Sequence, residues 1–303
     1  MKKALIIGMH GFVGRYLQKE LESHGYEVYG LSRDGAEKNI LHININDREK
    51  VQEAIKELSP EYIFHLAGIS SPGLAEKERQ LTFDTHIEGT RNILDASLLL
   101  PTPPKILIVT SSHVYGDPEY VPIDEKHPLL GKGAYAESRI EQEKMVREYF
   151  DTLDIIITRS FNHTGPGQPD AFVVPKLVKH VVEIQKGVRE FLEAGNLEVK
   201  RDILDVEDVV RAYRLLLEGN TFGIICNVCR GEAIRLRDIV DITAQLCNLP
   251  TVEVRVNPAF IRPNDPEEVY GDNLLLKNTV AWQVQTPFPD LIQKIYSYWN
   301  NTL

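Results

Sequence analysis

Short apolar runs alternate with amphipathic stretches through the first half of the chain. The apolar runs predict buried strands, and the stretches between them have the spacing of helices that bury one face. The expected strands cover residues 3–8, 26–32, 40–45, 62–67, 105–111 and 154–161. The expected helices cover residues 12–24, 47–58, 79–99 and 133–150. This alternation is typical of a doubly wound parallel sheet, so we predict a Rossmann-like α/β fold.

The pattern changes after Asn162. Residues 165–169 read Gly-Pro-Gly-Gln-Pro and predict a loop, residues 172–187 predict a helix, and the proline-rich stretch 255–272 predicts irregular chain. We expect residues 1–161 to form a dinucleotide-binding domain, with return segments near residues 200–230. Residues 162–303 are then expected to form mainly a smaller C-terminal α/β substrate-binding lobe.

Three glycines follow the first expected strand and open the first expected helix. The segment reads Gly8-Met9-His10-Gly11-Phe12-Val13-Gly14. Glycines at this spacing allow a tight turn, a close approach of the backbone to a pyrophosphate, and close packing of the helix on the sheet. The start of the helix then offers free N–H groups to an anion. The sequence therefore predicts a dinucleotide site here.

Composition limits the classes of function. The chain has 303 residues, a net charge of -10 and 43% hydrophobic residues, which suits an enzyme-sized globular protein and argues against nucleic-acid binding. No apolar stretch approaches the ~18 residues of a membrane span. We expect no targeting segment, because the apolar run after Lys2-Lys3 is short and His10 and Arg15 interrupt it. We therefore expect no membrane association.

The three cysteines indicate no disulfide framework and favour a cytoplasmic protein. Cys226 and Cys229 form a C-x-x-C motif, but residues 223–229 read as a strand. A spacing of three places two strand residues on opposite faces of the sheet, so we expect no metal site.

The segment Tyr135-Ala-Glu-Ser-Arg139 carries candidate chemistry. On a helix, positions i and i+4 lie on the same face, so the cation of Arg139 lies beside Tyr135. A free phenol ionises near pH ~10, which is too high for efficient proton transfer at neutral pH. A neighbouring cation stabilises the phenolate by charge. Arginine supplies that charge, but it lacks the compact head group of lysine.

Together these segments resemble the extended short-chain dehydrogenase/reductase family over essentially the whole chain. The resemblance is to its sugar-nucleotide branch, and within that branch to the GDP-4-keto-6-deoxymannose reductases and GDP-mannose 4,6-dehydratases. Residues 110–116 resemble the segment that carries the family's catalytic Ser or Thr, and residues 65–68 resemble the loop that closes over the cofactor. Residues 161–168 resemble the substrate-binding turn.

The resemblance implies three sets of site residues. The implied catalytic residues are Ser111, Tyr135 and Arg139. The implied cofactor-binding residues are Gly8, Gly11, Phe12, Val13, Gly14, Ser32, Arg33, Asn44, Ile45, Leu66, Ala67, Gly68, Tyr135 and Arg139. The implied substrate-binding residues are Ser70, Ser111, His113, Tyr135, Asn162, Asn196, Arg201 and Arg262.

The end of the second expected strand indicates the cofactor. Relatives that use NAD place an acidic residue there for the adenosine ribose, whereas a 2′-phosphate favours hydroxyl and guanidinium groups. This chain has Ser32 and Arg33, which favour NADP(H) over NAD(H). Asp34 keeps the NAD alternative open.

Residue 113 bears on the activity. The 4,6-dehydratases carry a Glu after the catalytic residue, because elimination of water needs a base. This chain has His113, which disfavours dehydration without excluding it. Epimerases of the branch hold NAD tightly, which Ser32 and Arg33 disfavour. We therefore expect an NADPH-dependent 4-ketoreductase, and keep as alternatives a dehydratase, an epimerase and a non-catalytic dinucleotide-binding sensor.

Residues 194–202 indicate the substrate and partners. Gly195-Asn196-Leu197 followed by Arg201-Asp202 is similar to the GDP-sugar subgroup, so GDP is favoured over UDP or dTDP. Arg201 and Arg262 are the candidates for the pyrophosphate. Relatives form homodimers through two long helices, and residues 79–99 and 133–150 are expected to do so here. Arg139 replaces the family's Lys, and His86 stands where relatives usually have Asn.

Overall fold

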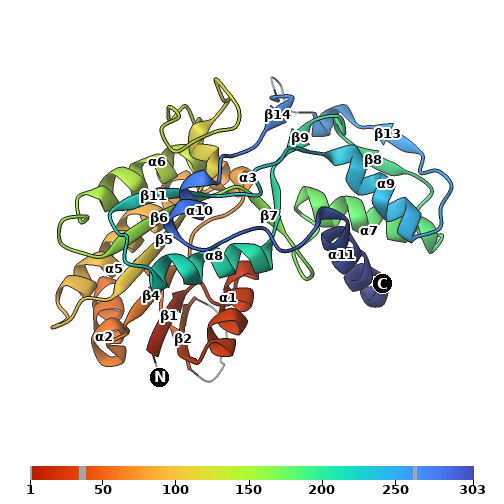
Figure 1. Cartoon of the computed structure of the whole chain (residues 1–303). Helices are drawn as coiled ribbons and strands as arrows, with labels where there is room; N and C mark the ends of the chain where they lie inside the picture. The colour runs from red at the N-terminus through yellow and green to blue at the C-terminus, as the bar shows by residue number, and fades with distance from the viewer. Residues whose placement is uncertain (1, 34–38, 262–264) are drawn as a thin grey trace.

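The structure, a computed structural model, describes residues 2–33, 39–261 and 265–303. Asp34 and Arg262 therefore lie outside the described residues. The chain forms two lobes, a larger one around the central sheet and a smaller one that contains the C-terminal helix (Figure 1). The N-terminal strand belongs to the larger lobe.

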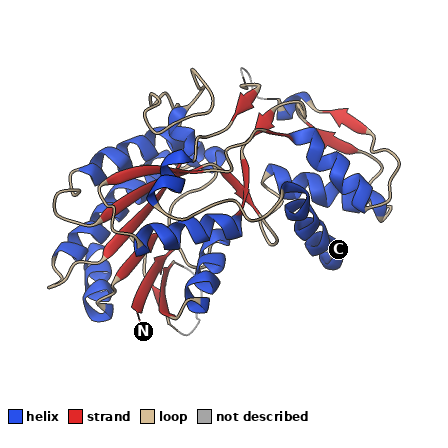
Figure 2. Cartoon of the chain, viewed as in Figure 1, coloured by secondary structure: helices blue, strands red, loops and turns tan. Residues whose placement is uncertain are grey.

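Seven strands form the central sheet of the larger lobe (Figure 2). Their order across the sheet is β11-β6-β5-β4-β1-β2-β3, and every neighbouring pair is parallel. Their bounds are β1 (Lys2–Ile7), β2 (Tyr26–Ser32), β3 (Ile40–His42), β4 (Tyr62–His65), β5 (Lys105–Ser111), β6 (Ile155–Ser160) and β11 (Ile224–Val228). The predicted doubly wound parallel sheet is confirmed.

Helices cover both faces of this sheet. Ala4 and Ile6 of β1 pack on the face covered by α1 (Phe12–Ser23) and α8 (Val206–Glu218). Leu5 and Ile7 pack on the face covered by α2 (Arg48–Leu58), α5 (Gly89–Leu98) and α6 (Ala134–Arg147). Because successive strand residues point to opposite faces and both faces are buried, residues 4–7 of β1 are all apolar.

The smaller lobe packs three helices around its own core. These helices are α7 (Val173–Gln185), α9 (Leu236–Leu246) and α11 (Phe288–Thr302), and β8 (Leu192–Ala194) pairs with β13 (Val254–Val256) beside them. The remaining short elements are β7 (Asn162–Thr164), β9 (Lys200–Arg201), β10 (Ile203–Asp205), β12 (Ile234–Arg235), β14 (Glu268–Val269) and α10 (Leu274–Thr279).

Two of the expected elements need correction, and one helix was not expected. The single helix expected over residues 79–99 is divided into α4 (Arg79–Phe83), a π-helical turn over Asp84–Glu88, and α5. A further helix, α3 (Pro72–Lys77), precedes it. The stretch 255–272 is not irregular throughout, because it contains the end of β13, a 3₁₀ turn over Pro258–Phe260, and β14.

Two expected strands end earlier than their apolar runs. β3 ends at His42 and β4 at His65, although residues 43–45 and 66–67 continue the apolar pattern. These residues leave the sheet and line a large cavity at its carboxyl edge. Apolar side chains that face a ligand cavity have the same sequence pattern as side chains that face a core, which explains the error.

Candidate active site

A cavity of about 980 Å³ lies at the carboxyl ends of the strands and reaches into the smaller lobe. This is where doubly wound sheets bind their ligands. Eighteen of the predicted site residues line it, namely Gly8, Gly11, Phe12, Val13, Gly14, Ser32, Arg33, Asn44, Ile45, Leu66, Ala67, Gly68, Ser70, Ser111, His113, Tyr135, Arg139 and Asn162. Residues that are far apart in the sequence thus meet at one site.

The glycine loop has the shape that a dinucleotide needs. Gly8 has φ +92°, and a Cβ there would lie 2.9 Å from the backbone nitrogen of Ala67. A Cβ on Gly14 would lie 2.5 Å from the carbonyl oxygen of Gly8. Helix α1 begins directly after Gly11, so its N-terminus faces the cavity without a side chain in the way. These residues fit a pyrophosphate held by backbone N–H groups.

The end of β2 forms one end of the cavity. Ser32 and the exposed Arg33 both line it. His10, from the glycine loop, places its Nδ1 3.1 Å from the Ser32 hydroxyl. Hydroxyl and guanidinium groups at this position suit an adenosine 2′-phosphate. His10 was not predicted as a site residue, although its place inside the glycine loop could have suggested it.

Ser111 and His113 lie where β5 ends. The Ser111 hydroxyl oxygen accepts a hydrogen bond from the His113 backbone N–H at 3.2 Å, and His113 Nδ1 lies 3.1 Å from the same oxygen. The His113 ring meets the Tyr135 ring edge to face, with centroids 5.4 Å apart. The structure therefore brings Ser111, His113 and Tyr135 together in the cavity.

Helix α6 carries Tyr135 and Arg139 into this group. The Arg139 guanidinium carbon lies 5.7 Å from the centre of the Tyr135 ring, and Arg139 is only 5% exposed. A Cβ on Gly68 would lie 2.5 Å from Arg139 Nη2 and 2.7 Å from His86 Nε2, so only glycine fits there. The cation is thus packed between Tyr135, the loop after β4 and the π-helical turn.

Two buried histidines border Arg139. The Ile69 backbone N–H donates to His86 Nε2 at 3.1 Å, so His86 is protonated at Nδ1, which lies 2.8 Å from the Ser138 hydroxyl. Burial and the charge of Arg139 lower the pKa of His86 to about 2 and the pKa of His65 to about 3. Both histidines are therefore neutral at physiological pH.

The smaller lobe contributes only some of its predicted residues. Asn162 lines the cavity, whereas Asn196 and Arg201 are not among its lining residues. Asn196 Oδ1 accepts from the Glu198 backbone N–H at 2.9 Å. Arg201 forms an ion pair with Asp265 at 2.7 Å and donates to the Pro266 carbonyl oxygen at 2.9 Å. Arg262, the other predicted pyrophosphate ligand, lies outside the described residues.

Some lining residues were missed by the sequence reasoning. His163, Gln168, Phe172 and Tyr213 also face the cavity. Gln168 lies in the segment that resembles the substrate turn, so its neighbours could have indicated it. Tyr213 belongs to α8, whose apolar face packs on the sheet, and no local pattern separates it from a core residue.

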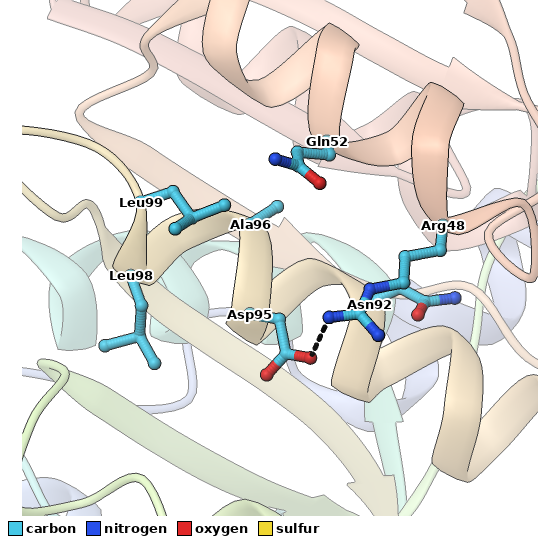
Figure 3. A pocket seen from close by; sticks show the side chains of 7 residues that line it. All are labelled: Arg48, Gln52, Asn92, Asp95, Ala96, Leu98 and Leu99. Atoms are coloured by element: carbon cyan, nitrogen blue, oxygen red, sulfur yellow. Dashed lines mark ion pairs between the residues drawn. The ribbon is translucent and has the colours of Figure 1, made fainter.

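A second cavity, of about 290 Å³, lies between α2 and α5 (Figure 3). Arg48 and Asp95 form an ion pair across it at 3.4 Å. Its lining includes no His, Cys, Ser or Tyr side chain, and it shares no lining residue with the large cavity. We therefore place the chemistry in the large cavity.

The described residues contain neither a metal-binding cluster nor a membrane-spanning helix. No three His, Cys, Asp or Glu side chains within the described ranges are grouped so that they could hold a metal ion. No helix of that part of the chain has the length and apolar character to cross a membrane. Cys226 and Cys229 are buried in two different core clusters, as the strand geometry predicts.

The chain is similar to known proteins over nearly its whole length. GDP-6-deoxy-D-mannose reductase of Pseudomonas aeruginosa is 28% identical over 99% of this chain and 98% of its own length. The solved structure of RMD from Pseudomonas aeruginosa in complex with NADPH has a TM-score of 0.90 and 26% identity, covering all of both chains. UDP-glucose 4-epimerase of Thermotoga maritima shares the fold, with a TM-score of 0.88 and 22% identity over 99% of both chains.

The strongest assignment comes from a family model. The model of the GDP-mannose 4,6 dehydratase family matches residues 5–295. This range includes parts of both lobes and every residue that lines the large cavity. The resemblance that the motifs predicted is therefore confirmed, and the chain belongs to the GDP-mannose 4,6 dehydratase family.

Proposed function

We propose that this protein uses NADPH to reduce the 4-keto group of a nucleotide-linked 4-keto-6-deoxyhexose. The observation that carries the proposal is the convergence of Ser111, Tyr135 and Arg139 on the cavity that the glycine loop also lines. The similarity to a GDP-6-deoxy-D-mannose reductase and to a structure bound to NADPH supports it. We propose GDP-4-keto-6-deoxymannose as the preferred substrate.

The cofactor assignment rests on the glycine loop and the end of β2. Gly8, Gly11 and Gly14 would hold the pyrophosphate, and Ser32 and Arg33 would hold the adenosine 2′-phosphate. Asn44, Ile45 and the loop of Leu66, Ala67 and Gly68 would complete the cofactor side of the cavity. When bound, NADPH supplies the hydride for the sugar carbon.

The protein's own residues supply placement and the proton. The Ser111 hydroxyl would donate a hydrogen bond to the ketone oxygen and hold it beside Tyr135. The Tyr135 hydroxyl would donate its proton to that oxygen in the reducing direction and take it back in the reverse direction. Arg139 would stabilise the phenolate that remains after the transfer. No covalent bond to the protein is needed.

His113 favours reduction over dehydration. It stands where the dehydratases carry the Glu that serves as base, and it contacts both Ser111 and Tyr135. Its contact with Ser111 suits a group that orients the hydroxyl, rather than one that reaches a distant sugar carbon. Dehydration and epimerisation remain the alternatives to be measured.

The remaining assignments are also proposals. We propose that residues 1–161, with return segments near 200–230, bind the dinucleotide, and that residues 162–303 mainly bind the sugar nucleotide. We place Ser70, Asn162, Asn196, Arg201 and Arg262 on the substrate side. We further propose a cytoplasmic homodimer that pairs residues 79–99 and 133–150, and sedimentation would measure its mass. The exposed Leu98 and Leu99 at the end of α5 support this interface.

The experiment is a turnover assay with purified protein. NADPH consumption is measured with GDP-4-keto-6-deoxymannose, and in parallel with the UDP- and dTDP-linked 4-keto-6-deoxy sugars. GDP-mannose with NADP⁺ tests for dehydratase activity in the same series. Tyr135→Phe should abolish turnover, whereas Tyr120→Phe, at an exposed tyrosine, should not. NADPH binding without turnover of any of these substrates would favour the sensor alternative.

A further inference from the structure

The Arg139 guanidinium is held only by neutral oxygens in the described hydrogen bonds. Nη1 donates to the carbonyl oxygen of Val109 at 3.3 Å and to Gln142 Oε1 at 2.8 Å. Within residues 2–33, 39–261 and 265–303, Arg139 takes part in no ion pair with a carboxylate. Buried arginines normally pair with an acidic group, since the charge is costly to bury alone. This one lies beside Tyr135 instead, with its guanidinium carbon 5.7 Å from the ring centre.

Gln142 is itself fixed in one orientation. It is fully buried, and its Nε2 donates to the Thr90 hydroxyl oxygen at 2.8 Å. The Thr90 hydroxyl in turn donates to the His86 carbonyl oxygen at 2.6 Å. Because the amide nitrogen is committed to Thr90, the amide oxygen faces Arg139. The π-helical turn, α5 and α6 are thereby joined in one buried network that ends on the guanidinium.

Four titratable groups that interact with Arg139 do not offset its charge, namely Tyr135 on the same helix, His86 on the π-helical turn, His65 on β4 and Tyr213 on α8. Glu143, one turn further along α6, pairs with the buried Arg159. The two histidines are neutral, and burial raises the pKa of Tyr213 well above its ordinary value. Tyr135 and Tyr213 both line the cavity, and Tyr135 is the one that becomes an anion in the proposed reaction.

We propose that Gln142 is a positioning residue for proton transfer, which holds the Arg139 guanidinium with a neutral oxygen and so reserves its positive charge for Tyr135. This inference rests on the proposed function of the same site. A carboxylate at position 142 could make the same hydrogen bond to Arg139, but it would neutralise the cation. The amide of Gln142 accepts the hydrogen bond from Arg139 without neutralising its positive charge.

The test compares two substitutions of Gln142. Gln142→Glu keeps the size of the side chain and adds a charge, whereas Gln142→Met keeps the approximate volume and removes the oxygen. Gln245→Glu adds the same charge at an exposed position of α9 and serves as the control. Each protein is assayed for kcat as a function of pH in both directions, with GDP-4-keto-6-deoxymannose and NADPH, and with the reduced sugar nucleotide and NADP⁺.

A second readout does not depend on turnover. The ultraviolet absorbance of phenolate measures the ionisation of Tyr135 in the cofactor-free protein. The transition that belongs to Tyr135 is the one that is missing in Tyr135→Phe. For Gln142→Glu we expect the pH of this transition to rise by about one unit. The rise of kcat in the oxidative direction should shift by the same amount, so kcat at a fixed pH below the transition should fall about tenfold. Gln245→Glu should move neither.

Gln142→Met should lower kcat by about three- to tenfold, the size of effect expected from a displaced positioning group, while the pH dependence stays near that of the wild type. An unmoved phenolate transition in a folded Gln142→Glu protein would overturn the proposal, and so would an unchanged kcat in Gln142→Met. Absence of turnover by the wild type would instead contradict the proposed function, and the absorbance titration would still decide the role of Gln142.

Discussion

Glu76 caps the helix that carries Tyr135. Its Oε1 accepts a hydrogen bond from the Ala134 backbone N–H at 2.5 Å, across the contact between α3 and α6. The N-cap residue Gly133 has no side chain to cap this end, and Glu137 of α6 accepts from the Gly133 backbone N–H at 3.1 Å, which leaves the Ala134 N–H to Glu76. Glu76 thus satisfies a helix-terminal donor one residue before Tyr135, and its negative charge interacts favourably with the helix dipole.

Glu76→Ala should therefore affect both stability and rate. We expect the free energy of unfolding to fall by about 1 kcal/mol, as for the loss of an N-cap, and kcat to fall several-fold as Tyr135 becomes less well placed. Denaturant unfolding and turnover measure the two effects. Glu53→Ala, at an exposed position of α2, is the control. Wild-type values for both quantities in Glu76→Ala would show that the cap has no consequence.

Arg33 gives a test of cofactor preference. In Arg33→Asp the new carboxylate would repel a 2′-phosphate and could accept a hydrogen bond from a 2′-hydroxyl. We expect the Kd for NADPH to rise at least about tenfold more than the Kd for NADH, the equivalent of ~1.4 kcal/mol. Titration calorimetry with both cofactors measures this difference, and Arg147→Asp, at an exposed position of α6, controls for net charge. Equal losses for the two cofactors would contradict the NADP(H) assignment.

Arg201 gives a test of the substrate side. Its guanidinium anchors Asp265 and the Pro266 carbonyl, next to the segment that contains Arg262. Arg201→Ala should raise KM for the nucleotide sugar by about tenfold and leave the Kd for NADPH nearly unchanged, because it removes the contacts to Asp265 and Pro266 on the proposed substrate side. Arg255→Ala, which removes an exposed ion pair with Glu253, is the matched control. A loss of NADPH affinity would contradict the assignment of Arg201 to the substrate side.

The architecture of the larger lobe followed from the sequence, and that of the smaller lobe did not. Strands such as β1 are apolar on both faces, and in a chain that alternates strands with helices this pattern is typical of a parallel sheet covered on both sides. The smaller lobe is built from short strands such as β9 and β12, with two residues each. Strands of that length are defined by distant pairing, which leaves no periodic pattern in the sequence.

The π-helical turn could not be predicted from the local pattern of apolar and polar residues either. The amphipathic spacing over residues 79–99 continues through it, so a single helix was expected. The extra backbone width at Asp84–Glu88 coincides with His86, whose two ring nitrogens meet Ile69 and Ser138 from other elements. Such insertions are common at functional sites, where tertiary contacts override local propensity.

The candidate site also contains residues that the sequence indicates and residues that it does not. Tyr135 and Arg139 are four residues apart on one helix, and the glycine loop is contiguous, so local spacing identified both. Gln142 is only one turn beyond Arg139, but a glutamine on a helix is usually a surface residue, so its position alone does not indicate a role in the site. Its function becomes visible only when Thr90, some 50 residues earlier, is seen to fix its orientation.

The buried histidines predict how stability depends on pH. The pKa values of His65 and His86 in the folded protein, about 3 and about 2, lie below the ordinary value of 6.5. Each histidine therefore takes up a proton on unfolding when the pH is below 6.5. Its contribution to stability is fully present above that pH and is lost progressively as the pH falls toward the folded-state value.

We therefore expect the free energy of unfolding to decrease as the pH is lowered from about 6.5 to about 5, with each histidine contributing up to ~1.4 kcal/mol per pH unit. His86→Asn should reduce that slope by up to about 1.4 kcal/mol per pH unit, since asparagine does not titrate. Urea unfolding at a series of pH values measures the slope, and His24→Asn, at an exposed histidine, is the control. An identical slope in His86→Asn and wild type would mean that His86 is not held neutral.

The last prediction concerns the charge next to Tyr135. Arg139 lies where the family has Lys, with its guanidinium carbon 5.7 Å from the Tyr135 ring. If that charge stabilises the phenolate, Arg139→Met should lower kcat at least about tenfold and move the rise of kcat in the oxidative direction to higher pH. Arg139→Lys keeps a cation and restores the smaller head group, so it should retain or increase activity.

These two variants separate charge from shape. Methionine is similar in length to the aliphatic part of arginine, so a loss in Arg139→Met together with full activity in Arg139→Lys would assign the effect to charge. An unchanged kcat and pH profile in Arg139→Met would make Arg139 a packing residue of α6. If Tyr135→Phe also had no effect, proton transfer would not occur at this helix, and the dinucleotide-binding sensor would be the better description of the protein.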